Sequence, residues 1–351
     1  MKTLPTVTFY FLGANSKDGF YSLYDQFTCG PKDILHIIKS GPGTGKSTFM
    51  KQIGKAAEAH GFDVEYILCS GDPTSLDGVY IPSLHVGWAD GTAPHILEPK
   101  HFGIDGNYIN LGQFCQLDNL YENQEKIKHL TAAYRFYYQK AYMYLHAAGS
   151  LQTILSRIPN DGEERIRTRA RAKAKKELSN IENTSHRPTK RFLSAISYIG
   201  NHILADTLHT LCDRICVVES GLGLERLYFE ELLCEANNRG VYYIECPNPL
   251  SPEHTEAILF PSLRLGFAVP QIASQYKGLA RTIHLDSHVE IEEKAEHRQN
   301  QKLKQQLLDA AYAQLSLAKH YHDKLEEYYR PALDVDALNQ YTATVIEHLF
   351  K

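Results

Sequence analysis

The sequence predicts an α/β protein made of two copies of one module, each a parallel sheet flanked by helices, with helical-hairpin extensions. Apolar runs typical of buried strands alternate with helical or loop segments over the first 111 residues. A similar order of apolar and turn residues recurs about 180 positions later. After each copy, apolar residues follow a spacing of three and four, which predicts the long helices of the extensions.

A glycine-rich stretch between a predicted strand and a predicted helix is the most informative part of the first copy. Residues 40–48 read Ser-Gly-Pro-Gly-Thr-Gly-Lys-Ser-Thr, and the apolar run at 34–38 before them predicts a buried strand. Apolar residues at helical spacing follow until Gly61, a residue suited to end a helix. This context is that of a P-loop, so we predict tandem P-loop NTPase-like modules.

The P-loop residues are predicted to bind ATP, or another nucleoside triphosphate, together with Mg²⁺. Lys46 would reach the β- and γ-phosphates, Ser47 would ligate Mg²⁺, and the Thr48 hydroxyl would lie near the α-phosphate. The usual pattern has glycine at position 40, where this chain has Ser40, and we expect a small effect on affinity. The predicted nucleotide-binding residues are Gly41, Pro42, Gly43, Thr44, Gly45, Lys46, Ser47 and Thr48.

The repeat predicts two domains, residues 1–185 with the P-loop and residues 190–351 with a degenerate copy. Residues 11–19 match residues 192–200 with five identities in nine, and Gly61 matches Gly240. At an offset of 180, Gly45, Lys46 and Ser47 become Glu225, Arg226 and Leu227. A carboxylate in the loop repels an anion, and leucine cannot ligate Mg²⁺. We therefore expect one working site, in the first copy.

Asp90 changes together with the P-loop residues, because its counterpart in the second copy is Val269. It follows a predicted core strand, where a carboxylate could hold Mg²⁺ directly or through water. We therefore name Lys46 and Asp90 as catalytic residues, and Ser47 and Asp90 as metal ligands. The alternative is a turn aspartate before Gly91.

Three further polar residues are weaker candidates. Asp72 ends a neighbouring strand, where it could orient a second substrate or a water, or serve the turn before Pro73. Asp77 and His95 have less support from their positions.

The helical extensions carry two further patterns. An aromatic stripe between Leu117 and Tyr144 favours helix packing over a ligand surface, and a break is expected at residues 148–150. Residues 163–176 are strongly charged, which indicates a solvated helix or, alternatively, a contact with phosphate or nucleic acid. A last helix is expected after Asp336, which could cap it.

Composition limits the class of protein. The formal net charge is −4 over 351 residues, which gives no global attraction to nucleic acid, so a nucleic-acid partner is not expected. No apolar run approaches the roughly 20 residues that span a bilayer, so no membrane association is expected. None of the seven cysteines forms a C-x-x-C pair, and we expect reduced thiols in a cytoplasmic protein.

With these motifs in view, the chain resembles a family of bacterial ATP-binding proteins built from two fused P-loop modules. The likeness rests on residues 41–48, 72–73, 76–78 and 90–95 and on the duplication, and it extends to 322–334. The resemblance implies a tandem P-loop α/β fold and an activity described as ATPase or similar to a nucleotide kinase. It supplies no substrate.

Three functions follow from the sequence as alternatives. The first is a Mg²⁺-dependent ATPase or NTPase with one site in residues 1–115. The second is a small-molecule or nucleotide kinase, although residues 60–115 contain no arginine to bind a phosphorylated acceptor. The third is a non-catalytic, ATP-gated binding module. The second substrate or protein partner is left open, as is a homo-oligomer, because no arginine finger is evident in the first copy.

Overall fold

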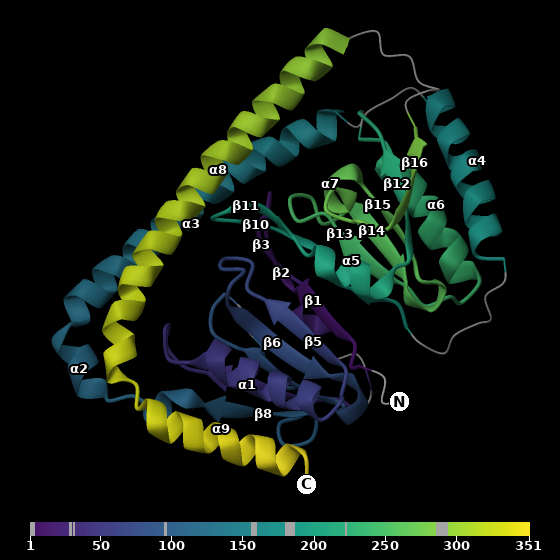
Figure 1. Ribbon diagram of the computed structural model, residues 1–351. Helices are drawn as coiled ribbons and strands as arrows, with labels where there is room; N and C mark the ends of the chain where they lie inside the picture. Colours follow the sequence, from purple (N-terminus) through teal and green to yellow (C-terminus); the bar gives the residue numbers. More distant parts are fainter. Residues whose placement is uncertain are drawn as a thin grey trace.

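The computed structural model describes residues 4–27, 30, 32–94, 97–155, 160–179, 187–221, 223–285 and 294–351. It is an α/β structure with two similar sheets of six mostly parallel strands, flanked by helices. Figure 1 shows the two sheets beside each other, with long helices running along one side of both. The expected α/β class with a duplicated architecture is confirmed at this level.

The first sheet has the strand order β1-β5-β6-β7-β4-β8. Five strands are parallel and β6 runs against them, so the expected fully parallel sheet is wrong at this strand. The sequence analysis missed β6 because Asp77 and Gly78 interrupt its apolar pattern; a Cβ on Gly78 would lie 3.1 Å from the Phe27 ring. The bounds are β1 (Val7–Phe11), β4 (Ile34–Lys39), β5 (Val64–Leu68), β6 (Leu76–Ile81), β7 (Val86–Asp90) and β8 (Gly106–Asn110).

The second sheet repeats this topology, with the order β16-β12-β15-β14-β13-β9. Strand β14 corresponds to β6 and is likewise the antiparallel member. Both sheets therefore share one plan, as the sequence repeat predicts. The bounds are β9 (Thr189–Lys190), β12 (Arg214–Glu219), β13 (Ile244–Pro247), β14 (Thr255–Phe260), β15 (Leu265–Ala268) and β16 (Leu279–His284).

Equivalent residues of the two halves meet at the centre of the molecule. The Phe11 N–H donates to the Phe192 carbonyl at 3.0 Å, and the Phe192 N–H donates back to Phe11 at 2.9 Å. Because these residues match in the repeat, the halves are related by an approximate two-fold axis through this pair. Both phenylalanines are fully buried in one core that the halves share. The flanking hairpins are β2 (Gly13–Ser16) with β3 (Gly19–Ser22), and β10 (Ser194–Ser197) with β11 (Gly200–Ile203).

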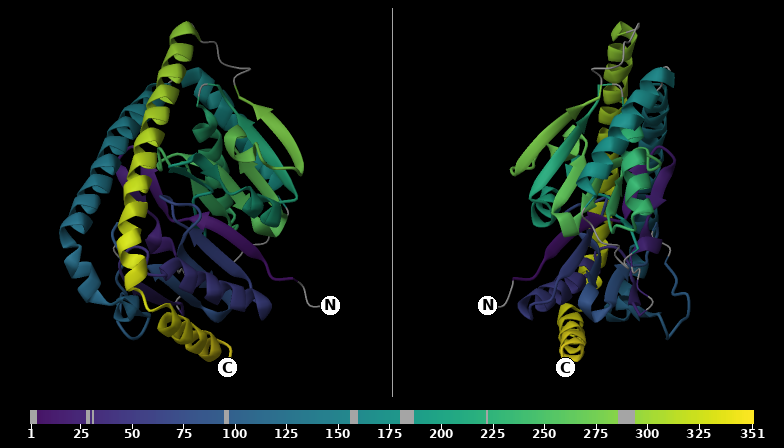
Figure 2. Two further views of the ribbon diagram at one scale, coloured as in Figure 1. Left: turned by 60° about the vertical axis from the view of Figure 1, so that its left-hand side comes forward. Right: turned by 90° about the vertical axis from the view of Figure 1, so that its right-hand side faces the viewer.

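Helices α3 and α8 pair along their length, and Figures 1 and 2 show them beside both modules. The rings of Tyr137 and Tyr321 stack at 5.3 Å, so the aromatic stripe is helix packing, as expected. The expected break at 148–150 is wrong, because α3 continues through Gly149, where a Cβ would lie 2.5 Å from the Lys17 Cβ. Glycine there lets the β2–β3 hairpin approach the helix.

The remaining bounds complete the fold. The helices are α1 (Lys46–Ala59), α2 (Leu117–Glu122), α3 (Gln124–Leu155), α4 (Asn160–Glu177), α5 (Ala205–Leu211), α6 (Glu225–Asn238), α7 (Pro270–Ala273), α8 (Lys294–Tyr329) and α9 (Val335–Leu349). Short 3₁₀ turns are η1 (Tyr24–Gln26), η2 (Pro82–Leu84), η3 (Leu111–Phe114), η4 (Pro261–Leu263) and η6 (Arg330–Ala332). Over the described ranges, no helix combines the length and apolar character needed to cross a bilayer.

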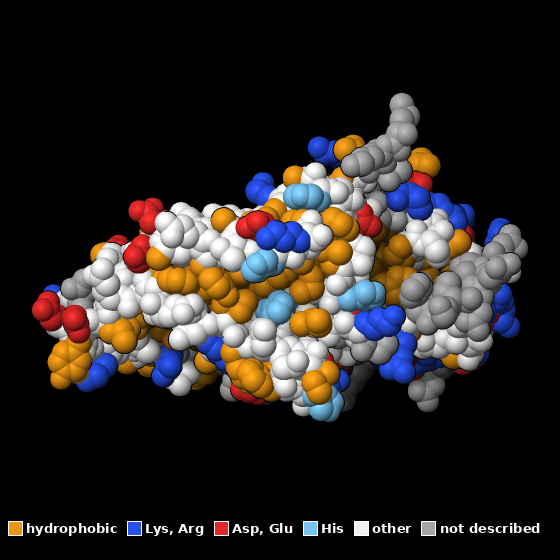
Figure 3. All heavy atoms as spheres, turned by 90° about the horizontal axis from the view of Figure 1, so that it is seen from below, with side chains coloured by type: hydrophobic (Ala, Val, Ile, Leu, Met, Phe, Trp, Pro, Cys, Tyr) orange, Lys and Arg blue, Asp and Glu red, His pale blue; other side chains and the backbone are white. Residues whose placement is uncertain are grey.

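The last helix of each half packs against the other half. Helix α9 lies on α1, where Leu338 is buried and the Tyr341 ring stacks on Phe49 at 6.1 Å. Seen from below, the face with α9 has hydrophobic side chains and histidines at its surface (Figure 3). The cap of α9 is Asp334 and not the expected Asp336, because the Ala337 N–H donates to the Asp334 carboxylate at 3.0 Å.

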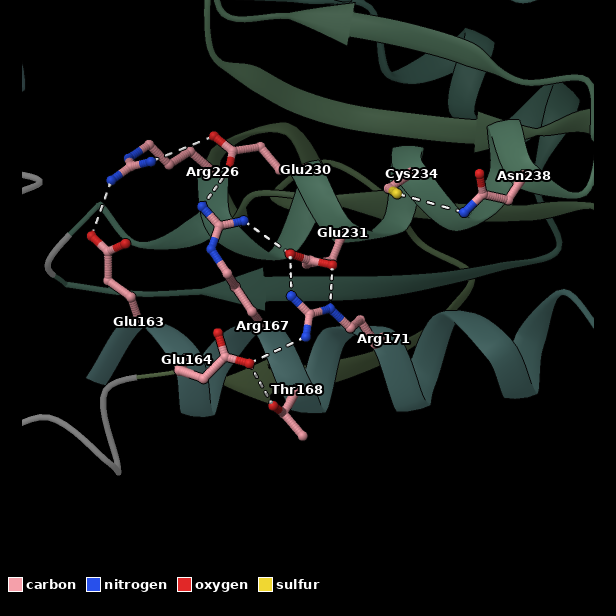
Figure 4. A network of polar contacts seen from close by, with 10 residues as sticks. All are labelled: Glu163, Glu164, Arg167, Thr168, Arg171, Arg226, Glu230, Glu231, Cys234 and Asn238. Atoms are coloured by element: carbon pink, nitrogen blue, oxygen red, sulfur yellow. Dashed lines mark hydrogen bonds and ion pairs between the residues drawn. The ribbon is translucent and has the colours of Figure 1, made fainter. Parts of the chain in front are cut away.

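Helix α4 lies in the same way on α6 of the second half. Arg167 pairs with Glu230 and Glu231, and Arg171 pairs with Glu231 and Glu164 (Figure 4). The adjacent stripe of α4 is apolar and buried, and consists of Ile166, Ala170 and Ala174, followed by Leu178 just after the helix. The expected solvated helix is therefore wrong for two faces of α4, one buried and one paired with glutamates.

The hairpin of the second half covers a buried acid. Glu256 accepts hydrogen bonds from the Ser194 hydroxyl at 2.6 Å and the Asn248 amide at 3.2 Å. Burial raises the pKa of Glu256 from the ordinary value of 4.5 to about 8, although both hydrogen bonds oppose the shift. The folded protein therefore takes up a proton at Glu256 that the unfolded chain releases above about pH 4.5.

This proton uptake predicts a pH-dependent stability. The favourable term is fully present below pH 4.5 and is lost as the pH rises toward about 8, with a slope of up to about 1.4 kcal/mol per pH unit. Glu256→Gln, which cannot titrate, should remove this part of the slope. The free energy of unfolding, measured by denaturant titration between pH 5 and 8, tests this. Equal slopes in both proteins would show that Glu256 does not titrate in this range.

The packing of α9 on α1 predicts a second stability effect. Leu338→Ala should lower the free energy of unfolding by about 2–4 kcal/mol, because it leaves a cavity between the two helices. Val335 is 54% exposed on the same helix, so Val335→Ala is the matched control and should change stability by less than about 0.5 kcal/mol. Denaturant midpoints of the two variants provide the measurement. Similar small losses in both would mean that α9 is not held on α1.

Candidate functional site

The glycine loop, residues 40–48, joins β4 to α1 with the backbone shape expected of it. Gly43 has a φ of +67° and Gly45 a φ of +83°, in the left-handed region that favours glycine. Gly45 precedes the first residue of α1, and the buried Thr44 donates its hydroxyl hydrogen to the Gly41 carbonyl at 2.7 Å. The loop thus ends at a helix N-terminus, where free N–H groups favour an anion.

Lys46 and Asp90 face each other across this loop. Strand β7 lies beside β4, with Asp90 in register with Ile38. The Lys46 ammonium donates to the Gly41 carbonyl at 2.6 Å and lies 3.6 Å from Asp90 Oδ2. Their side chains are 11% and 12% exposed. The structure therefore brings together the two residues that the sequence named as catalytic.

Asp90 also performs the turn role that was its alternative. Its Oδ1 accepts hydrogen bonds from the Thr92 N–H at 2.8 Å and the Thr92 hydroxyl at 2.6 Å. The two carboxylate oxygens thus have different tasks, since Oδ1 holds the turn and Oδ2 faces Lys46. The turn fixes the direction of the carboxylate toward the loop.

Ser47 and the remaining loop residues complete the predicted set. The Leu76 N–H, at the start of β6, donates to the Ser47 hydroxyl oxygen at 2.9 Å, which leaves that hydroxyl one lone pair and its hydrogen. Thr48 is exposed on the first turn of α1, and Pro42 is half-buried in the loop. The β5–β6 connection therefore touches the loop, which the sequence analysis did not foresee because it missed β6.

The donor set fits a magnesium ion that arrives with a phosphate. Within the described residues, no group of three or more His, Cys, Asp or Glu side chains could hold a metal ion by itself. Mg²⁺ usually keeps several waters and binds one or two protein oxygens together with phosphate oxygens. Ser47 and Asp90 can supply those protein oxygens, so the residues present fit that arrangement.

The C-terminal half covers the outer side of the glycine loop, which no sequence signal indicated. A Cβ on Gly41 would lie 2.8 Å from the Tyr329 ring, and one on Gly43 would lie 3.0 Å from the Glu326 Cβ. A Cβ on Gly45 would lie 2.6 Å from the Leu338 side chain. These close approaches require glycine at all three positions, apart from any ligand.

Asp72 lies under α8 in the β5–β6 connection. Its Oδ2 is 3.3 Å from the Lys319 ammonium, and its Oδ1 accepts from the N–H and hydroxyl of Thr74. Burial raises the pKa of Asp72, but the hydrogen bonds from Thr74 and the charge of Lys319 outweigh it, so the net shift is downward. Asp72 therefore both shapes its turn and contacts the other half of the chain.

Of the two weaker candidates, only Asp77 lies within the described residues. Asp77 is buried on β6. Burial of the Cys69 thiol, and to a smaller extent the negative charge of Asp77, raise the pKa of Cys69. His95 lies outside the described residues.

The second loop, residues 220–225, differs from the first in length. Helix α6 begins at Glu225 and α1 at Lys46, an offset of 179, whereas β12 and β4 differ by 180. Buried residues confirm the helix register, because Met50 corresponds to Phe229 and Ile53 to Leu232. The expected match of Lys46 with Arg226 is therefore wrong by one residue, and Glu225 takes that position.

Glu225 brings a negative charge of the chain itself to the second loop. Its carboxylate accepts a hydrogen bond from the Ser220 N–H at 3.1 Å. Arg226, at the position of Ser47, pairs with Glu163 and Glu230, each at 3.4 Å (Figure 4). The conclusion from the sequence is unchanged, because this loop has neither a lysine nor a hydroxyl at the required positions.

No protein-family model matches this chain, and neither a curated protein nor a solved structure matches it. The resemblance to two-module P-loop proteins therefore stays a prediction.

Proposed function

We propose that the chain binds ATP or another nucleoside triphosphate with Mg²⁺ at residues 41–48 and hydrolyses it at a single site. The observation that carries this proposal is the position of Lys46. It lies at a helix N-terminus, within a loop with two left-handed glycines, and 3.6 Å from Asp90 Oδ2. A metal-bound triphosphate requires a cation, backbone N–H groups and a carboxylate that are directed at one place.

Each group has a task in this proposal. The loop N–H groups and the start of α1 bind the phosphate oxygens. Lys46 exchanges its bond to the Gly41 carbonyl for the β- and γ-phosphates and stabilises the charge of the transferring phosphoryl group. Ser47 and Asp90 orient the metal, which when bound neutralises phosphate charge and polarises the γ-phosphoryl group.

The fold supports a relation to P-loop NTPases, which is also part of the proposal. In both modules a glycine-containing loop follows the strand next to one edge of the sheet and leads into a helix, and Asp90 ends the parallel neighbour of β4. The antiparallel β6 departs from a fully parallel sheet. On this view the second module is a structural copy, because Glu225 replaces an external anion at its loop.

A second candidate function is an ATP-gated binding module, and the packing of the loop favours it over a kinase. Gly41, Gly43 and Gly45 contact α8 and α9, so a loop that moves on nucleotide binding would move the C-terminal helices. A kinase would need arginines placed to bind a phosphorylated acceptor, but Arg330, beside this contact, is paired with Glu326. Arg167 and Arg171 are instead paired with glutamates of α6.

The proposal predicts opposite results for two cations of the two loops. Lys46→Ala should weaken ATP binding by at least about 100-fold, or about 3 kcal/mol, because a charge facing the phosphates is lost. Arg226→Ala is the matched control on the second loop and should leave affinity and turnover unchanged. Calorimetry and phosphate release measure both. Equal losses in the two variants would refute the single-site proposal.

Asp90 predicts a separation of binding from hydrolysis. Asp90→Asn keeps the shape and the oxygen that holds the turn, but removes the negative charge opposite the metal. Turnover should fall about 100-fold while ATP affinity changes by less than about 10-fold. Turnover measured across a Mg²⁺ titration provides the readout. If this variant keeps wild-type turnover at low Mg²⁺, Asp90 does not take part in holding the metal ion.

A further inference from the structure

One face of α8 lies along the glycine loop and the β5–β6 connection of the first module. Residues Lys319, His322, Glu326 and Tyr329 follow at spacings of three and four, so they share one face of the helix. Lys319 contacts Asp72 of the β5–β6 connection, while Glu326 and Tyr329 contact the glycine loop. His322 therefore lies between these two contacts, over the gap between the β5–β6 connection and the loop.

Two side chains of the helix pair are neighbours of the His322 ring. Its Nδ1 is 3.6 Å from Glu326 Oε1, and the Tyr134 ring of α3 meets it edge to face at 5.6 Å. The Arg330 guanidinium donates to the other oxygen of Glu326 at 2.6 Å and so fixes that carboxylate. With Nδ1 directed at Glu326, Nε2 is the nitrogen free for another partner.

Burial favours the neutral form of the His322 imidazole. Burial lowers the pKa of His322, the Lys319 and Lys46 cations lower it further, and Glu326 and Asp323 oppose them. The geometry agrees, since Glu326, one turn further along α8, packs against Gly43 of the loop that leads to Lys46. A neutral imidazole near the loop lysine is in the state that can accept a proton.

We propose that His322 faces the γ-phosphoryl group of the bound nucleotide and is the general base for the attacking water. This inference rests on the proposed function. The water oxygen forms a bond to the γ-phosphorus as the bond from phosphorus to the bridging oxygen breaks, and the nucleoside diphosphate leaves with that electron pair. The water proton passes to His322 Nε2, and Glu326 stabilises the resulting imidazolium. Glu326 is a positioning residue, because it acts through His322.

The inference names a catalytic group that the sequence could not supply. The N-terminal half contains the phosphate-binding loop, and the base comes from α8 in the C-terminal half. In other phosphate-transfer proteins, a catalytic side chain can reach the phosphates from an element outside the phosphate-binding module. In this chain, α8 would supply such a side chain.

The test compares His322→Ala with His320→Ala, in the full chain with ATP and Mg²⁺. His320 is an exposed histidine two residues away on the same helix and is the matched control. His322→Ala should lower kcat about 100-fold, with ATP affinity by calorimetry within about 3-fold of wild type. Added imidazole should raise the kcat of His322→Ala at least about 10-fold and should leave the kcat of the other proteins unchanged. His320→Ala should match wild type in every measurement.

Other outcomes separate this inference from the proposed function. Wild-type turnover by His322→Ala, or a loss that imidazole does not restore, overturns the inference while leaving nucleotide binding in place. If His322→Ala is misfolded by circular dichroism, His322→Gln replaces it and must show the same loss of kcat at unchanged affinity; unchanged kcat overturns the inference. If the wild-type chain binds no ATP, the proposed function fails and this inference fails with it.

Discussion

The exchange of terminal helices between the halves is the constraint on which the rest of the structure depends. Helix α9 packs on α1, and α4 packs on α6, so each half covers the helix that follows the other half's loop. To place α9 on α1, α8 must run beside the first module, where its Glu326 and Tyr329 meet the glycine loop. The candidate site is therefore built from both halves, although the glycine loop comes from one.

The two loops show how one scaffold can have different chemistry at equivalent places. The first has Lys46 and a hydroxyl at the start of its helix, and the second has Glu225 and an arginine. Glu225 accepts a loop N–H, as an external anion would. The Ser220 N–H of the second loop is therefore satisfied by a carboxylate of the chain itself.

The sequence predicted what depends on local patterns. The strand-loop-helix unit at 34–59, the repeat and the carboxylate of Asp90 all follow from short segments, and the structure has them in place. The β6 strand was missed because Asp77 and Gly78 interrupt its apolar pattern, and Gly78 packs closely against the Phe27 ring. The faces of α4 and α8 could not be assigned, because their charged residues reveal their partners only after the chain folds. The one-residue shift of the second loop could not be predicted from the sequence either.

The number of nucleotide sites tests the central claim most directly. Calorimetry of the wild-type chain with ATP and Mg²⁺ should give one site per chain, and no binding should remain in Lys46→Ala. Two sites per chain, or one site that persists in Lys46→Ala, would contradict the account, because the second loop would then bind the nucleotide.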